Sequence, residues 1–546
     1  MITRRQLIQA LGATPLAGLM PLPVLASRRV DLTLGEQTVN FSGRSVTATT
    51  VNQGLPGPIL RWREGDTVTI NVTNQLSVDS SIHWHGIILP SNMDGVPGLS
   101  FPGIKPGKTF QYQFKLNQSG TYWYHSHSGF QEQTGLFGAI VIEPKDGDPW
   151  KVDRDYVVQL SDWSDESPQR IMANLRKNSH FYNRNRRRLQ DTLRDIRRKG
   201  IKATLSEREM WNQMRMADSD ISDVTGFTYT YLMNGQTNER GWHGVFNKGE
   251  RIRLRFINAA AMSFFDVRIP GLKMKVIAAD GQDIEPVSVD DFRLGVAETL
   301  DVIVEPEADI PYAIFAQAMD RSGYALGHLT PQAGLMATPP GLDPVPILEH
   351  QDMGMAMNMS GHDHHHHHKH GGMQQIQHAA TEYGPHVDMR AENPQYRLND
   401  PGPGLRQHHK LGRRVLTYGD MTRLTKAPIR DPDQEIELHL TGNMERYLWS
   451  INGIPYHHAE PMHWRLGSRT RVTFVNDTMM SHPMHLHGMW SELETGSEHL
   501  PWKHTVVVLP GAKISYQVNA DVPGKWAYHC HLMYHMMGMF REVHVA

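Results

Sequence analysis

The stretch His529-Cys530-His531-Leu532-Met533-Tyr534-His535 lies near the end of the 546-residue chain and contains its only cysteine. On an extended strand alternate side chains face the same side, so His529 and His531 face one way and Cys530 faces the other. A cysteine, two histidines and a weak axial methionine form the ligand set of a blue, electron-transferring copper. The stretch therefore predicts two metal sites, one on each face of a single strand. A lone cysteine also excludes an intrachain disulfide framework.

Three further histidine clusters precede this stretch. They are His83-Trp84-His85-Gly86, His125-Ser126-His127 and His482-Pro483-Met484-His485-Leu486-His487-Gly488. Each contains a His-x-His pair, which on a strand presents two imidazoles to one point, and imidazole is a good donor for copper or zinc. His482 and His535 lie outside the pairs, which makes them candidates for the site of Cys530. One His-x-His pair is common by chance, but four pairs, the last enclosing the only cysteine, indicate a metal protein.

Composition and periodicity predict an all-β protein of several domains. At roughly 150 residues per domain, the length indicates three or four domains. Segments such as 66–72 and 471–475 alternate polar and apolar residues, and 47 Gly and 33 Pro interrupt the chain at short intervals. The 55 basic and 57 acidic residues nearly cancel, which excludes a generally basic nucleic-acid binder.

A coarse internal repeat predicts three related β-sandwiches. Similar charged turns at residues 63–68, 247–253 and 465–468 each lead into an apolar strand, and histidine clusters follow the first and the third. We therefore expect sandwich domains over residues 27–147, 148–345 and 406–546, with the metal chemistry in the first and the last.

The N-terminus predicts export. Thr3-Arg4-Arg5-Gln6-Leu7-Ile8 opens an uncharged, mostly apolar run that reaches Ala26, where cleavage before Ser27 is expected. This pattern is typical of a twin-arginine signal peptide over residues 1–26, a route that carries folded proteins. The alternative is an N-terminal segment with two chance arginines. No later apolar run reaches the ~18 residues of a membrane span, so we expect an exported protein with no membrane span.

Two stretches interrupt the β pattern. Between residues 168 and 217, Leu189, Leu193 and Ile196 recur at helical spacing among arginines, which predicts an amphipathic basic helix inserted into the second domain. We expect this helix to cover the sandwich, since an exported chain has little nucleic acid to contact. The second stretch, residues 346–405, is a Met/His-rich segment with four methionines and seven histidines in residues 353–370. It is either a copper-recruiting segment or a plain interdomain linker.

Together the four histidine motifs, in this order and at opposite ends of the chain, resemble those of the multicopper oxidases. The segments 479–490 and 539–543 and the Met-rich insertion are similar to the periplasmic copper-resistance protein A branch of that family. The resemblance covers nearly all of the chain after residue 26. It implies three cupredoxin-like Greek-key β-sandwich domains, a periplasmic location and four copper ions, one of type 1, one of type 2 and two of type 3.

The resemblance also assigns residues to these ions. The type 1 copper takes His482, Cys530 and His535, and the type 2 copper takes His83 and His485. The type 3 pair takes six histidines, namely His85, His125, His127, His487, His529 and His531. Asp94 matches the acidic residue that assists proton delivery near the three-copper cluster, and a plain turn aspartate before Gly95 is the alternative.

The axial position departs from the family pattern. The family usually places its axial residue ten positions after the cysteine and after a glycine, whereas here Gly538-Met539 falls one position early and Phe540 is the tenth. Either the loop is one residue shorter and Met539 is axial, which we favour, or Phe540 faces the copper and no axial ligand exists. The choice affects the redox potential.

The resemblance implies an oxidase that couples one-electron oxidation of a donor to four-electron reduction of O2 to water. Because thioethers favour Cu(I) and the chain holds 29 Met, we expect Cu(I) as the donor, phenolic substrates as further donors, and copper tolerance as the benefit. Met480 matches a methionine of cuprous oxidases, although Thr478 replaces their acidic residue and Asp477 lies one position away. A laccase-like phenol oxidase and a non-catalytic copper-sequestering protein are the alternatives. Copper-handling periplasmic proteins are candidate partners.

Overall fold

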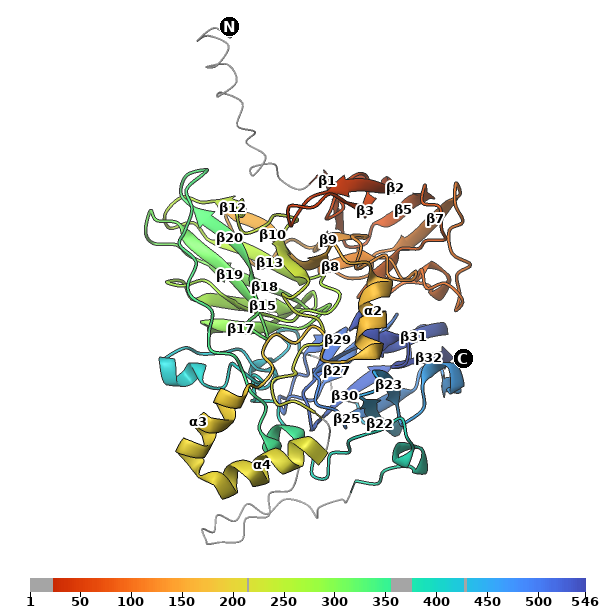
Figure 1. The fold of residues 1–546 in the computed structure, drawn as a ribbon. Coiled ribbons are helices and arrows are strands. Elements are labelled where there is room, and N and C mark those ends of the chain that lie inside the picture. The colour runs from red at the N-terminus through yellow and green to blue at the C-terminus, as the bar shows by residue number, and fades with distance from the viewer. Residues whose placement is uncertain (1–22, 214–215, 355–375, 427–429) are drawn as a thin grey trace, which may run out of the picture.

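The computed structural model describes residues 23–213, 216–354, 376–426 and 430–546, and in this part of the chain the strands form six sheets (Figure 1). The sheets lie in pairs that follow one another along the chain, so the molecule consists of three β-sandwiches. The expected all-β architecture of cupredoxin-like domains is confirmed.

The first sandwich packs a sheet of order β1-β4-β9-β8-β6 against a sheet of order β3-β2-β5-β7. Its strands are β1 (Val24–Leu25), β2 (Arg29–Val39), β3 (Val46–Val51), β4 (Ile59–Arg63), β5 (Thr67–Asn74), β6 (His83–His85), β7 (Thr109–Lys115), β8 (Gly120–His125) and β9 (Phe137–Glu143). In β5, Val68, Ile70 and Val72 are buried between more exposed polar residues, because one face of that sheet meets the core. The edge strand β6 places His83 opposite His125 of β8.

The second sandwich packs a sheet of order β11-β10-β13-β18-β15-β16 against one of order β12-β20-β19-β14-β17. Its strands are β10 (Arg154–Ser164), β11 (Tyr229–Met233), β12 (Trp242–Val245), β13 (Ile252–Asn258), β14 (Phe265–Arg268), β15 (Met274–Ala279), β16 (Gln282–Val289), β17 (Asp291–Leu294), β18 (Thr299–Val304), β19 (Tyr312–Ala318) and β20 (Tyr324–Thr330). Buried polar contacts tie it to the first sandwich: Asp301 accepts hydrogen bonds at 2.9 Å from both Arg255 and Thr121.

The third sandwich packs a sheet of order β23-β22-β25-β30-β27-β28 against one of order β24-β32-β31-β26-β29. Its strands are β22 (Gln434–Asn443), β23 (Leu448–Ile451), β24 (Met462–Trp464), β25 (Arg469–Asn476), β26 (His482–Leu486), β27 (Ser491–Leu493), β28 (Trp502–Lys503), β29 (Thr505–Val508), β30 (Ala512–Asn519), β31 (Gly524–Cys530) and β32 (Phe540–Val545). Before this sandwich, β21 (Gln395–Tyr396) pairs with β30. The third histidine motif begins on β26, and the last begins at the end of the neighbouring strand β31.

The internal repeat seen in the sequence corresponds to one strand of each sandwich. The three charged turns precede β5, β13 and β25, and each of these strands pairs in parallel with the first long strand of its sandwich: β2, β10 and β22. Equivalent strands therefore occupy equivalent positions in the three sandwiches.

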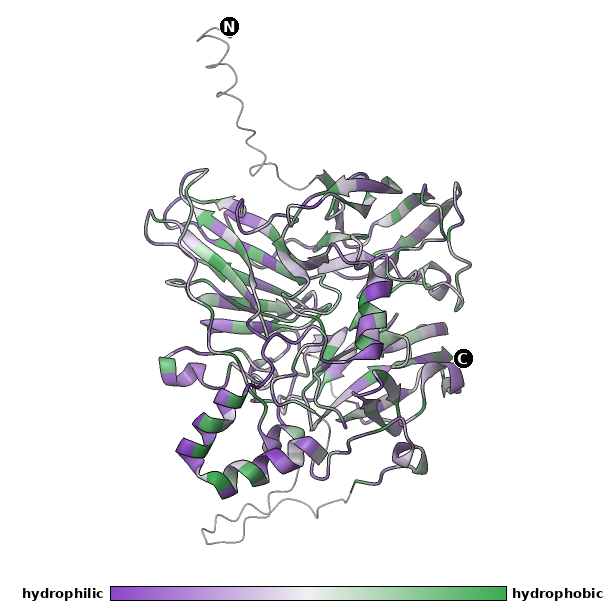
Figure 2. Cartoon of the chain, viewed as in Figure 1, coloured by the Kyte–Doolittle hydropathy of each residue, from purple (hydrophilic) through white to green (hydrophobic). Residues whose placement is uncertain are grey.

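The insertion in the second domain is helical, but it consists of three helices, α2 (Pro168–Lys177), α3 (Leu189–Lys199) and α4 (Ile201–Gln213). Helix α2 buries Ile171, Met172 and Leu175 against the body of the protein. The expectation that the stripe of Leu189 and Leu193 covers the sandwich is wrong, since these side chains are 76% and 46% exposed. Helices α3 and α4 instead pack against each other at the edge of the molecule (Figures 1 and 2). Their side chains Leu189, Leu193, Ile201 and Leu205 are exposed, whereas Trp211 near the end of α4 is buried in the core.

Short helices complete the described chain: η1 (Ser91–Met93), η2 (His350–Met353), η3 (Ala380–Tyr383), η4 (His408–Leu411), η5 (Tyr418–Asp420), η6 (Tyr456–His458) and α5 (Met533–Met536). None of the helices in the described residues has the length and apolar character needed to cross a bilayer. The twin arginines and the Met/His tract of residues 355–370 lie outside the described residues. Of the expected signal peptide, Val24 and Leu25 pair with β4 as strand β1.

Candidate metal centre

Cys530 and two histidines converge at one end of the third sandwich. The Cys530 Sγ atom lies 3.5 Å from His482 Nδ1 and 4.0 Å from His535 Nδ1, and the two Nδ1 atoms are 3.3 Å apart. All three residues are buried. Burial raises the pKa of the Cys530 thiol, so in the absence of a cation the sulfur holds its proton. One soft donor and two imidazoles at these separations suit a copper ion.

Strand geometry explains why this triad forms. Strands β26 and β31 are antiparallel neighbours, with Met484 opposite Cys530 and His485 opposite His529. Because side chains alternate along a strand, His482 and Met484 share the face of Cys530, whereas His485 faces the other way. The third residue of the triad, His535, lies in helix α5, and the ring of Trp449 stacks on it at a centroid distance of 3.8 Å.

The eight histidines of the four His-x-His pairs converge on the opposite face, between the first and third sandwiches. His529 Nε2 lies 3.3 Å from His127 Nε2 and 3.0 Å from His487 Nε2. A second group brings His531 Nε2 within 3.4 Å of His125 Nε2.

The other three histidines complete the cluster. The His85 ring lies 5.0 Å from the ring of His531, and the rings of His83 and His485 are 5.8 Å apart. Four histidines come from each of the two domains, so the cluster exists only when these domains are in contact.

The tautomers imposed by the surroundings suit metal binding. Five of the eight imidazoles have Nδ1 within 3.0 Å of an outer oxygen, which leaves Nε2 facing inward: His83, His125, His485, His487 and His529. His83 Nε2, His485 Nε2 and His85 Nδ1 are buried without a hydrogen-bond partner. Such orphaned nitrogens are costly unless an ion binds them.

Burial also keeps the cluster in the form that binds metals. It lowers the pKa of His85, His125, His127, His485, His487 and His531, and it lowers that of His529 to about 3. Neutral imidazole is the ligand form. The donor set therefore fits the three further coppers that the family resemblance implies.

Asp94 lies directly behind this cluster. Its carboxylate accepts from His487 Nδ1 at 2.8 Å and is 3.2 Å from His83 Nδ1, which also donates to the Asp94 carbonyl oxygen at 2.9 Å. The sharp turn after it requires Gly95, because a Cβ there would lie 1.8 Å from the carbonyl oxygen of Ile82. Asp94 thus orients two histidines of the cluster, one from each domain, rather than serving only the turn.

Three further residues contact the predicted ligands and were not found from the sequence. Glu132 Oε2 accepts from His125 Nδ1 at 2.8 Å, and Asp223 Oδ2 accepts from His535 Nε2 at 2.5 Å. His504 Nδ1 lies 3.2 Å from His85 Nε2. These partners lie seven or more residues away in the chain, and for His85 the separation is 419 residues. The only signal for these three residues in the sequence was their type, acidic or imidazole, and the chain has many residues of both types.

The axial position is resolved in part by strand parity. Phe540 pairs with His529 in the β31–β32 ladder, and its ring stacks on the His529 ring at 5.6 Å, away from the thiol. The Met539 carbonyl accepts from the Cys530 N–H at 3.0 Å, and the Met539 side chain is fully buried in the core that contains Cys530. The preceding residue must be glycine, because a Cβ on Gly538 would lie 2.0 Å from the Trp449 carbonyl oxygen.

Thr478 takes part in the thiolate site in place of an acid. Its hydroxyl lies 2.7 Å from His482 Nε2 and therefore fixes the orientation of that ring. The neighbouring Asp477 points elsewhere, toward His439.

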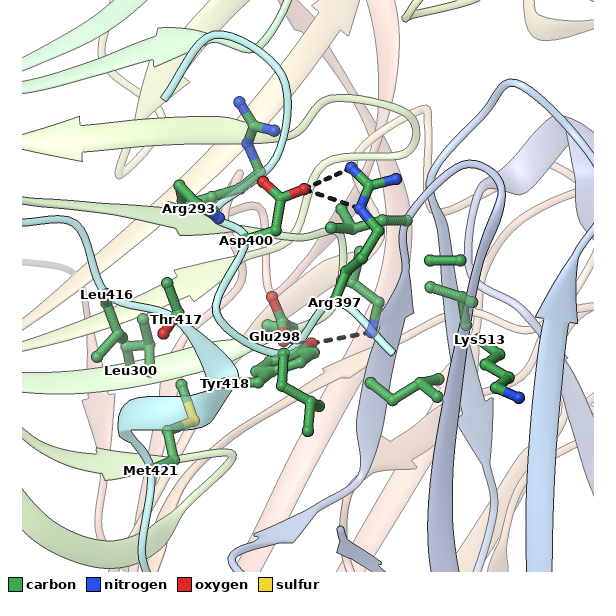
Figure 3. Close-up of a pocket in the computed structure, with 17 residues that line it drawn as sticks. Arg293, Glu298, Leu300, Arg397, Asp400, Leu416, Thr417, Tyr418, Met421 and Lys513 are labelled. Carbon is green, nitrogen blue, oxygen red and sulfur yellow. Dashed lines mark hydrogen bonds and ion pairs between the residues drawn. The ribbon is translucent and has the colours of Figure 1, made fainter. Parts of the chain in front are cut away.

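Two pockets lie near the centre, and they differ in what they reach. The pocket in Figure 3 lies between the second domain, the linker and the third domain, has about 730 Å³ of empty space and is lined by residues such as Arg293, Arg397 and Tyr418, with none of the predicted ligands. A second pocket of about 950 Å³ opens on the first domain and is lined by His127. The second pocket therefore reaches one histidine of the cluster.

The fold and the two centres define a class of protein: a three-sandwich copper oxidase in which a thiolate site and a histidine cluster share one strand. Comparison with known proteins agrees. Family models described as multicopper oxidase match residues 33–147, 200–336 and 430–546. Among solved structures, Fet3p, a multicopper oxidase that functions in iron import, aligns with a TM-score of 0.65 at 18% identity, over 95% of this chain and 90% of that one.

Relatives in sequence are much closer. The chain is 50% identical to copper resistance protein A of Escherichia coli, over 96% of this chain and 94% of that protein. It is 52% identical to the copper resistance protein A homolog of Pseudomonas syringae pv. tomato, over 95% and 93%. The chain therefore belongs to the multicopper oxidase family, in its copper resistance protein A branch, and is a copper-dependent oxidase with one type 1, one type 2 and two type 3 coppers.

Proposed function

We propose that this oxidase removes one electron at a time from Cu(I), passes the electrons to O2 and thereby supports copper tolerance. The observation that carries the proposal is the closure of the thiolate site. His535 is fully buried, and the carboxylate of Asp223 covers its outer nitrogen while also accepting from the Tyr447 hydroxyl at 2.9 Å. A bulky phenol cannot contact the imidazole edge of His535, because Asp223 covers it. An electron from a small cation has to pass only through the carboxylate of Asp223 to reach His535.

The protein around this site supports a cuprous donor. Met444 and Met533 are buried in the same core as Cys530, and thioethers favour Cu(I). The relatives at about 50% identity are named for copper resistance, which agrees with copper as the donor.

We propose the ligand assignment that the family resemblance implies, and the proximity of His127, His487 and His529 and of His482, Cys530 and His535 supports it. His482, Cys530 and His535 would hold the type 1 copper, with Met539 axial, and His83 and His485 would hold the type 2 copper. The type 3 coppers would be held by two groups of three: His85, His125 and His531, and His127, His487 and His529. When bound, the four coppers supply single-electron uptake at type 1 and four-electron reduction of O2 to water at the cluster.

The chain's own residues support this chemistry by orientation and access. Cys530 is covalently joined to His529 and His531, so backbone bonds link the two centres. Asp94 and Glu132 hold imidazoles from outside, which fixes their tautomers. The pocket at His127 is the route that we assign to O2 and to water leaving the cluster.

We also propose that the protein acts in the periplasm after twin-arginine export. The arginine pair at Arg4 and Arg5 and the apolar run up to Ala26 support this location. Cleavage after Ala26 would remove the short strand β1. Sequencing the N-terminus of the secreted protein tests this: Ser27 as the first residue supports the proposal, and a retained Met1 contradicts it.

Oxygen uptake tests the proposed activity. Copper-loaded protein is supplied with Cu(I) or with a phenol, and Cys530→Ser serves as the control that lacks the thiolate. We expect rapid O2 consumption with Cu(I), slow consumption with the phenol and neither in the variant. Faster turnover of the phenol would identify a laccase-like enzyme, and copper uptake without O2 consumption would identify a sequestering protein.

A further inference from the structure

A second cluster of potential metal ligands lies outside the four-copper centre. It consists of His378, Glu382, His439 and Asp477. His378 and Glu382 are one turn apart at helix η3, His439 lies on β22, and Asp477 follows β25. Glu382, His439 and Asp477 are at most 3% exposed, and the His378 side chain is 10% exposed.

One atom from each residue points to a common centre. His378 Nδ1 lies 2.8 Å from Glu382 Oε2 and 3.5 Å from Asp477 Oδ2. His439 Nδ1 lies 3.2 Å from Glu382 Oε2 and 2.7 Å from Asp477 Oδ2. With metal–ligand bonds of about 2.0–2.2 Å, tetrahedral ligands are roughly 3.3–3.6 Å apart. Expanding the shorter of these contacts by roughly half an ångström would therefore admit an ion.

The outer contacts of the cluster match those of a metal site. Glu437 Oε1 accepts from His439 Nε2 at 3.2 Å, which turns His439 Nδ1 toward the centre, where a metal ion would displace its proton. The second Asp477 oxygen accepts from the Ala391 N–H at 2.7 Å. A carboxylate behind a histidine and a fixed carboxylate are the features that orient metal ligands.

The charges also favour a cation. Within the described residues, neither Glu382 nor Asp477 forms an ion pair with an arginine or a lysine, so their negative charge is balanced by the two imidazoles alone. The cluster thus attracts positive charge strongly, whether as a proton or as a metal ion.

We propose that His378, Glu382, His439 and Asp477 form a fifth metal site, which binds a divalent cation and prefers Cu(II) to Zn(II). Two imidazoles and two carboxylates are donors of the borderline and hard kind, and the Irving–Williams order places Cu(II) first for such a set. The absence of sulfur from these four residues separates the site from a thioether site for Cu(I). The site does not depend on the oxidase activity, because none of its residues is a predicted ligand of the other four coppers.

Metal binding to the four-copper protein tests the site. The histidines at 362–370 would bind copper themselves, so all chains carry asparagine at those seven positions. Cu(II) and Zn(II) are titrated by equilibrium dialysis into this background and into its His378→Gln and Glu382→Gln variants. His386→Gln is the matched control, because His386 is an exposed histidine close in sequence.

We expect one equivalent beyond the four coppers in the background chain and in the control, with Cu(II) bound more tightly than Zn(II). Each cluster variant should bind it at least about 10- to 100-fold more weakly. Anomalous diffraction at the metal edge should show the ion among the four donor atoms, and the visible band of the type 1 copper verifies folding. Equal affinity in all four chains, or an anomalous peak elsewhere, would show that the cluster is only an ion-pair network.

Discussion

Replacing Asp94 tests whether the histidine cluster needs a carboxylate that orients it, because the variant keeps all of the predicted ligands. In Asp94→Ala, the His487 Nδ1–H loses its acceptor at 2.8 Å and stays buried. A buried donor without a partner costs about 1–3 kcal/mol, and at 1.36 kcal/mol per tenfold this corresponds to roughly 5- to 150-fold. We therefore expect O2 consumption with Cu(I) to fall about 100-fold, with loss of copper from the cluster.

Asp94→Asn should be milder for a reason visible in the structure. One amide oxygen replaces the acceptor for His487, while the amide nitrogen would face His83 Nδ1, a donor facing a donor. His83 still has the Asp94 backbone carbonyl oxygen at 2.9 Å, so its tautomer is preserved. We expect a loss of about 10-fold, at the lower end of the range for residues behind a ligand.

The assay combines O2 uptake, copper content per chain and the visible absorption of the type 1 copper. The absorption should be unchanged in both variants, because Asp94 contacts His83 and His487 but not the Cys530 site. Asp31→Asn, an exposed change in the same domain, is the matched control. Full activity with four coppers in Asp94→Ala would refute the reasoning that this carboxylate orients the cluster.

The remaining predictions concern the thiolate site and pH. Met539→Leu should raise the type 1 redox potential while keeping its absorption, and Phe540→Leu should leave the potential unchanged; the reverse result in a redox titration would make Phe540 the residue that faces the copper. Asp223→Asn should lower the rate with Cu(I) about 10-fold and raise the potential, because a neutral amide replaces the carboxylate at His535, and an unchanged rate would contradict the role of Asp223. Protons compete with copper for imidazole, and burial lowers the pKa of His529 from 6.5 to about 3. Copper content measured against pH should therefore persist as the pH falls through 6.5 and should drop only near the lowered pKa of about 3. Copper release centred on pH 6.5 would contradict this prediction.

Much of the fold followed from local patterns. Alternation in segments such as β5 and the repeated turns before β5, β13 and β25 gave the sandwiches, because a strand with one buried face must alternate. The helical insertion was predicted from its spacing, but its packing was not. Leu189 and Leu193 have the periodicity of a buried stripe, yet both side chains are exposed, and a helical period does not say what a helix packs against.

The sequence alone determined which strands carry the predicted ligands and that Cys530 faces away from His529 and His531, because the alternation of side chains along a strand is a local property. It also narrowed the axial choice to Met539 or Phe540. Only the tertiary structure placed Glu132, Asp223 and the cluster of His439 with Asp477, because those contacts join segments whose spacing in the chain carries no information about their distance in space. The paired ligands lie two residues apart in the sequence, whereas the groups that orient them are brought close only when the chain folds.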